Sequence, residues 1–113
     1  MPRSEVQGRV KLGEAFAAVE GSPQRLATLF RHGTLEVEFY APKGTDPQTP
    51  HERDEVYVIA RGSGVFRCHG RREPFGPGDF LFAPAGMEHG FEEFSEDFGA
   101  WVLFYGPKGG EPA

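Results

Sequence analysis

The chain has 113 residues, enough for one small domain with a single hydrophobic core. Its net charge of −5 argues against a nucleic-acid-binding surface, and no apolar stretch approaches the roughly 20 residues needed to cross a bilayer. The single cysteine, Cys68, excludes an internal disulfide and indicates a reducing, cytoplasmic location. The first ten residues also lack the apolar segment of a signal peptide.

One helix and then a series of short strands are predicted along the chain. The segment KLGEAFAAVE, residues 11–20, has apolar residues at helical spacing and predicts a short helix. Beyond it the apolar period is two, which predicts strands at 25–30, 35–40, 55–60, 65–68, 80–83, 89–94 and 99–105. The clearest alternation is LEVEFY at 35–40, where Leu35, Val37 and Phe39 share one face.

The number and spacing of these strands indicate the fold class. Many short strands joined by glycine- and proline-rich turns are typical of an antiparallel sandwich or barrel. No helices are available to cross over between parallel strands, so a doubly wound sheet is excluded. We therefore predict one all-β domain over residues 1–113, with its core at about 25–105, a loose N-terminus at 1–10 and a loose tail at 106–113.

The four histidines fall into two groups. His32 and His69 each precede a glycine at a predicted hairpin turn, where an exposed side chain is expected. His51 instead lies four residues before Glu55 at the mouth of a predicted strand, and His89 opens another strand after the tight turn at 84–86. A strand start places a side chain at the rim of a barrel interior, where it can meet residues of neighbouring strands.

Two motifs around these residues resemble those of the cupins. In GDFLFAPAGMEH, the residues Gly78, Pro84, Gly86 and His89 match every spacing of the second cupin motif. The second half of the first motif is present as His51, Glu55 and Gly62. Its first histidine is replaced by Thr49, and the asparagine that follows the second motif is replaced by Glu93. The resemblance covers about residues 33–105.

The resemblance implies a fold and an oligomeric state. The expected fold is an antiparallel double-stranded β-barrel of the cupin or jelly-roll type, with a short N-terminal helix. Similar single-domain cupins commonly form homodimers, and the exposed edges of a short sandwich give a physical reason for pairing.

The resemblance also implies a divalent metal ion, held by His51, Glu55 and His89. Two imidazoles and a carboxylate form the ligand set of mononuclear non-haem iron sites, and they also suit Zn, Mn, Ni or Co. Gln48 or Asp46 could offer an oxygen in place of the lost imidazole, and Gln48 is the closer of the two. The alternative is a barrel whose metal site has decayed.

Three functions follow from this site. The leading hypothesis is a metal-binding cupin that acts as a small-molecule oxygenase, in the manner of a dioxygenase. The alternatives are a non-catalytic module that binds or senses a small molecule, and a metal-free cupin that binds or isomerises sugars. If Glu55 points inward then Tyr57 does too, and its hydroxyl could donate a hydrogen bond near the metal, although core packing is the simpler interpretation of this ring. The many aromatic residues favour a largely apolar or aromatic ligand in the barrel.

Overall fold

The computed structural model describes residues 8–112 as one helix followed by short strands. The helix is α1 (Leu12–Glu20), which confirms the helix predicted at 11–20. The strands are β1 (Leu26–His32), β2 (Leu35–Tyr40), β3 (Asp54–Arg61), β4 (Gly64–Cys68), β5 (Arg71–Phe75), β6 (Phe80–Ala83), β7 (His89–Glu92) and β8 (Gly99–Tyr105). All the predicted strands are found, with ends shifted by at most a few residues, and β5 is an additional one.

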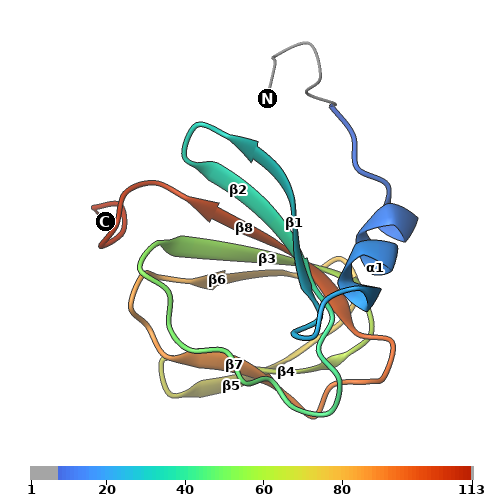
Figure 1. Ribbon diagram of the computed structural model, residues 1–113. Coiled ribbons are helices and arrows are strands. Elements are labelled where there is room, and N and C mark those ends of the chain that lie inside the picture. The colour runs from blue at the N-terminus through green and yellow to red at the C-terminus, as the bar shows by residue number, and fades with distance from the viewer. Residues whose placement is uncertain (1–7, 113) are drawn as a thin grey trace.

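The strands form two antiparallel sheets that face each other (Figure 1). The larger sheet has the order β1-β2-β8-β3-β6 and the smaller sheet has the order β5-β4-β7. The predicted antiparallel all-β architecture with one short helix is therefore confirmed. The closed barrel is not: within residues 8–112 the strand pairs form two separate sheets, so the double-stranded architecture is an open sandwich.

The main core fills the space between the two sheets. Buried aromatic and aliphatic side chains from both inner faces form this core: Tyr40, Tyr57, Ile59, Phe66, Phe75, Ala83, Phe91, Phe98, Ala100, Val102 and Phe104. A smaller core lies on the outer side of the larger sheet, where α1 packs against β1 and β2 through Ala15, Val19 and Phe39. Both faces of β2 are therefore covered near its end, and the apolar surface buried on each face contributes to the stability of the fold.

The strand that sequence reasoning missed, β5, lies at an edge of the smaller sheet. Its residues Arg71, Arg72, Glu73 and Pro74 are all exposed, so it carries no alternation of apolar and polar residues. Proline is tolerated at an edge because an amide hydrogen can be missing on the side that faces solvent. Local hydrophobic pattern therefore cannot reveal this strand.

The C-terminal tail, which was expected to be loose, donates backbone hydrogen bonds to residues at the start of β3 and just before it. The backbone N–H of Glu111 donates to Oδ2 of Asp54 at 2.8 Å, and the N–H of Gly109 donates to the carbonyl of Glu52 at 2.7 Å. Of the N-terminus that was expected to be loose, residues 1–7 lie outside the described residues. Between residues 8 and 112, no helix has the length and hydropathy needed to span a membrane.

Candidate metal centre

The two motif histidines and the motif glutamate come from different parts of the fold. Glu55 lies near the start of β3 in the larger sheet, and its side chain points into the space between the sheets with 1% exposure. His89 is the first residue of β7 in the smaller sheet and is 5% exposed. His51 lies in the irregular segment before β3 and is partly exposed. The site therefore spans the gap between the sheets.

The three side chains meet at one oxygen atom. Nδ1 of His51 lies 3.2 Å from Oε1 of Glu55, and Nε2 of His89 lies 3.1 Å from the same oxygen. One potential ligand atom from each residue falls within 4.8 Å of the others. The predicted convergence of two imidazoles and a carboxylate is thus found in the structure.

Backbone hydrogen bonds explain why the two motifs meet. The N–H of Gly86 donates to the carbonyl of His51 at 2.7 Å, and the N–H of Ala85 donates to Oδ1 of Asp54 at 3.0 Å. Gly86 has a φ of 76°, a left-handed conformation that glycine adopts without steric cost. The tight turn before His89 is therefore tied directly to the segment that carries His51.

A hydrogen bond to the backbone orients the ring of His89. In the neutral imidazole, Nδ1–H donates to the carbonyl of Met87, with 2.9 Å between the heavy atoms. Nε2 then faces Glu55, where it donates a hydrogen bond when the ring is protonated and offers a lone pair to a cation when the ring is neutral. Metal-binding histidines are commonly fixed in this way, because the second ring nitrogen selects the tautomer and the orientation.

The hydroxyl of Tyr57 lies 2.9 Å from Nε2 of His89. Tyr57 is fully buried on β3, as its shared face with Glu55 predicted. Burial raises the pKa of Tyr57 well above its usual value, so the hydroxyl keeps its proton and can donate it in a hydrogen bond. The ring also packs edge-on against Phe66 and Phe91, so the residue contributes both to the core and to the site.

The charges at the centre are strongly coupled. Burial raises the pKa of Glu55, but its hydrogen bonds with His51 and His89 outweigh that effect and lower the pKa to about 2. The hydrogen bond with Glu55 raises the pKa of His51 despite burial. Burial lowers the pKa of His89, but its bonds with Glu55 and Met87 prevail and raise the pKa. The carboxylate thus attracts positive charge to the site, either as protons or as a metal ion.

Two buried oxygen atoms have no hydrogen-bond partner within the described residues: Oε2 of Glu55 and Oε1 of Gln48. A buried oxygen without a partner is costly, and a cation satisfies it. Gln48 and His51 also line one small cavity of about 240 Å³, with Tyr40. The donor set and the two unpartnered oxygens therefore fit a divalent metal ion.

The structure gives Asp46 a different role from that of a ligand. Its Oδ1 accepts hydrogen bonds from the Tyr40 hydroxyl at 2.6 Å and the Gln48 N–H at 3.1 Å, and its Oδ2 accepts one from the Phe91 N–H at 2.9 Å. Both oxygens are therefore engaged. Asp46 ties the segment before β3 to β7 and positions the backbone that carries Gln48 and His51.

A further acidic residue at the site, Glu38, was missed by sequence reasoning. Glu38 lies on the inner face of β2. The charge of His51 lowers the pKa of Glu38, and the charge of Glu55 raises it. Burial, together with the neighbouring Glu36, raises the pKa of Glu38. The alternation in LEVEFY could have placed Glu38 and Tyr40 on one face, but it did not show that this face looks toward the centre.

Comparison with known proteins gives one family. A family model described as a cupin domain matches residues 36–104. An uncharacterized protein of Streptomyces coelicolor is 32% identical over 80 residues, which cover 69% of this chain and 76% of that protein.

Solved structures show the same fold at low sequence identity. A cupin 2 conserved barrel domain protein from Salinispora arenicola matches with a TM-score of 0.61 and 20% identity, over 73% of this chain and 75% of that one. A predicted oxalate decarboxylase from Thermotoga maritima matches with a TM-score of 0.57 and 22% identity, over 71% and 77% of the two chains. At such identities the likeness concerns the fold alone.

Proposed function

The chain belongs to the cupin family. We propose that it binds one divalent metal ion through His51, Glu55 and His89. The observation that carries the proposal is the convergence of both imidazoles on Oε1 of Glu55, at 3.2 and 3.1 Å. Gln48, whose buried Oε1 has no partner within the described residues, would supply a further oxygen in place of the imidazole that Thr49 lacks. The donor set suits Fe, Zn, Mn, Ni or Co.

The surrounding residues prepare these ligands. Met87 holds the His89 ring with Nε2 directed at Glu55, and Asp46 holds the segment that carries Gln48 and His51. When bound, the metal would supply Lewis acidity and open coordination positions to a small molecule. The two sheets would flank the bound molecule and limit the access of water from both sides.

We propose oxygenase chemistry, of the dioxygenase kind, as the activity of this centre. Two histidines and one carboxylate are the ligand set typical of non-haem iron oxygenases. The Tyr57 hydroxyl lies 2.9 Å from Nε2 of His89. It would therefore hold a proton next to a substrate bound at the centre. The alternative functions are a non-catalytic binding or sensing module, in which the metal only anchors a ligand, and a metal-free cupin that binds or isomerises sugars. The single cysteine, which has no partner for an internal disulfide, favours a reducing compartment such as the cytoplasm.

Metal analysis of protein purified without chelator tests the binding proposal. We expect about one metal ion per chain, lost in the His51→Ala and His89→Ala variants and retained in His32→Ala, whose side chain is exposed at the end of β1. The Gln48→Ala variant should keep the stoichiometry but bind more weakly. Full metal content in both ligand variants would show that the ion is held elsewhere.

Oxygen consumption then separates an enzyme from a binding module. The iron-loaded protein is given a panel of small diketones, thiols, catechols and amino acids. Turnover that disappears in His89→Ala supports the oxygenase. Metal binding without turnover across the panel favours the sensing module.

A further inference from the structure

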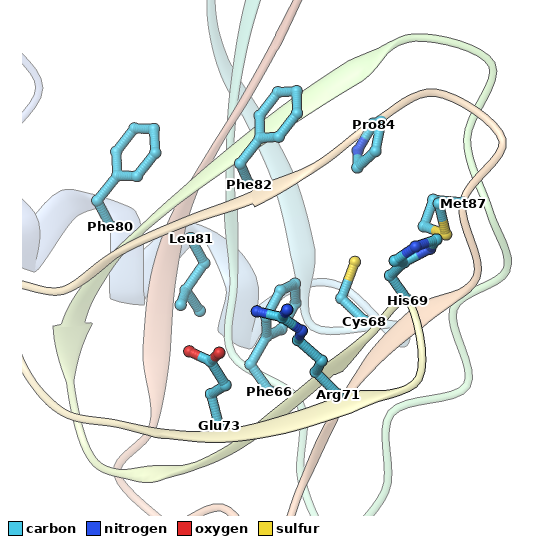
Figure 2. Close-up of a pocket in the computed structure, with 10 residues that line it drawn as sticks. All are labelled: Phe66, Cys68, His69, Arg71, Glu73, Phe80, Leu81, Phe82, Pro84 and Met87. Carbon is cyan, nitrogen blue, oxygen red and sulfur yellow. The ribbon is translucent and has the colours of Figure 1, made fainter.

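A pocket separate from the small cavity at His51 lies at the open edge between the two sheets (Figure 2). It has a volume of about 490 Å³, within the range of pockets that hold small organic ligands. One side is formed by β6, at the edge of the larger sheet, and the other by β5, at the edge of the smaller sheet. No strand pair closes this edge within residues 8–112, so the pocket opens between the sheets.

The inner wall of the pocket is apolar. Phe66 of β4 and Leu81 of β6 lie at the inner end of the pocket, and Cys68 and Met87 extend this apolar lining (Figure 2). Burial raises the pKa of the Cys68 thiol, so the group remains neutral. This wall suits an aromatic or branched aliphatic group.

The side of the pocket formed by β5 carries two opposite charges. Arg71 and Glu73 are two residues apart on the strand, so they share a face, and both point toward Phe66 and Leu81 in Figure 2. Neither forms an ion pair with another described residue. Arg72 between them, by contrast, is paired with Glu92 and Glu93 on the outer face of the sheet. Besides His69, the charged groups that line the pocket are thus one cation and one anion, which lie beside an apolar wall.

Only one aromatic ring separates this pocket from the metal centre. The centroid of the Phe66 ring lies 6.1 Å from that of His89 and 5.8 Å from that of Tyr57. Met87, which lines the pocket, also accepts the hydrogen bond from His89 through its carbonyl. A ligand in the pocket would therefore be separated from His89 and Tyr57 by the ring of Phe66.

We propose that this pocket binds an amino acid with an aromatic or branched side chain. Arg71 pairs with the carboxylate, Glu73 pairs with the ammonium group, and Phe66 and Leu81 contact the side chain. A zwitterion matches the charge of the pocket, whereas a simple anion would meet Glu73 and a simple cation would meet Arg71. Binding does not require the metal, but the role of this molecule as substrate rests on the proposed metal centre.

A matched set of ligands tests the proposal by calorimetry on the metal-free, full-length protein. The set is phenylalanine, 3-phenylpropionate without the ammonium group, phenethylamine without the carboxylate, and alanine without the apolar body. Phenylalanine should bind most tightly, and each truncated compound should bind roughly tenfold more weakly or worse. NMR shift mapping should place the response at Leu81 and Cys68.

Variants assign each charge. Arg71→Gln should weaken phenylalanine and 3-phenylpropionate but not phenethylamine, and Glu73→Gln should weaken phenylalanine and phenethylamine but not 3-phenylpropionate. Arg72→Gln, one residue away on the opposite face, should bind all compounds as the parent protein does.

Equal binding of the four compounds, no binding of any, or an unchanged phenylalanine affinity in Arg71→Gln would overturn the assignment. These results would leave the metal content untouched, so this inference and the proposed metal centre fail independently.

Discussion

Nε2 of His89 lies 3.1 Å from Oε1 of Glu55, although the two residues belong to different sheets. Between these sheets the main contacts are apolar side chains of the core. The Glu55–His89 pair is thus a polar link across the sandwich, at the same point where His51 approaches from the preceding segment. A metal ion bound here would join both sheets and the segment before β3.

Metal should therefore stabilise the whole fold. An ion that binds only the folded protein, at a concentration 100-fold above its Kd, contributes about 2.7 kcal/mol to the free energy of unfolding. We expect a higher melting temperature after addition of Zn, Ni or Fe and its reversal by chelator, measured by calorimetry. The His51→Ala variant serves as control, because it should show no metal-dependent rise. A rise of equal size in that variant would contradict the assigned ligands.

The metal-free and metal-bound proteins should respond to pH in opposite ways. Folding raises the pKa of His51 and His89 above the usual 6.5, so their protonated forms stabilise the metal-free fold below 6.5 and this contribution is lost as pH rises through the raised values. Folding lowers the pKa of Glu55 from 4.5 to about 2, so its contribution is present above 4.5 and is lost as pH falls toward 2. These groups therefore favour the metal-free fold most between 4.5 and 6.5.

Metal ligation requires neutral imidazoles, so the affinity for metal should rise with pH over the range in which the metal-free protein loses this stability. Urea unfolding with and without metal, on both sides of the raised histidine pKa values, measures the two trends. In the double variant His51→Ala/His89→Ala the alkaline loss of stability should be absent. Persistence of that loss in the double variant would assign it to other groups.

Removal of the Tyr57 hydroxyl tests its position beside His89. Tyr57→Phe keeps the buried ring but loses one hydrogen bond, so the free energy of unfolding should fall by about 0.5–1.5 kcal/mol. Metal stoichiometry should be unchanged, because Tyr57 is not among the proposed ligands. If the hydroxyl serves the reaction, oxygen consumption should fall while metal content stays constant. Loss of the metal itself in Tyr57→Phe would instead make this residue part of the coordination shell.

Asp46→Ala should weaken both the fold and the site. The carboxylate accepts hydrogen bonds from the side chain of Tyr40 and from the backbone of Gln48 and Phe91. Their removal should cost about 1–3 kcal/mol of folding free energy, measured by urea unfolding. It should also lower metal affinity, because the segment that carries His51 loses its tie to β7. Asp97→Ala, at an exposed carboxylate that accepts a hydrogen bond from Ser95 in the turn before β8, is the control and should leave metal affinity unchanged.

The outer faces of the two sheets differ, and the more apolar one is the face on which we expect a second copy of the chain to pack. The smaller sheet carries ion pairs of Arg67 and Arg72 with Glu92 and Glu93. The outer face of the larger sheet presents two cross-strand rows of apolar side chains, of which Trp101 also packs against the smaller core under α1: Val37, Val56, Val58, Phe80, Phe82, Trp101 and Leu103. Phe80 is 65% exposed and Phe82 is 41% exposed. An uncharged apolar face is complementary to a second copy of itself.

Sedimentation equilibrium should therefore give a dimer for the parent protein and a monomer for Phe82→Lys. The lysine charge would be buried against the same apolar face of the second copy. Arg72→Gln, on the outer face of the other sheet, should remain dimeric. A parent protein that sediments as a monomer, or a dimer that survives Phe82→Lys, would contradict the role of this face.

The period-two pattern was enough to predict most of the strands. Glycine positions were enough to predict several turns as well. Gly62, which follows β3, has a φ of 86°, and a Cβ there would lie 2.6 Å from the Cα of Phe98. β5 could not be predicted in this way, because every residue from Arg71 to Pro74 is exposed and the strand is defined only by its pairing with β4. The tail after β8 could not either, since its order depends on hydrogen bonds to Glu52 and Asp54, far away in the chain.

Residue types and their spacing were enough to predict the all-β class, the two motif segments and His51, Glu55 and His89 as candidate ligands. Residue type and spacing are local properties, and they can be read along the chain without knowledge of the fold. The packing of the sheets was needed to show that these three meet, that Asp46 bonds to β7, and that Glu38 faces the centre. It was also needed to show that Oε1 of Gln48 is buried without a partner among the described residues. Each of these depends on which strands pair and which face of a strand is turned inward, and the free energy of burying side chains across the whole chain fixes that choice.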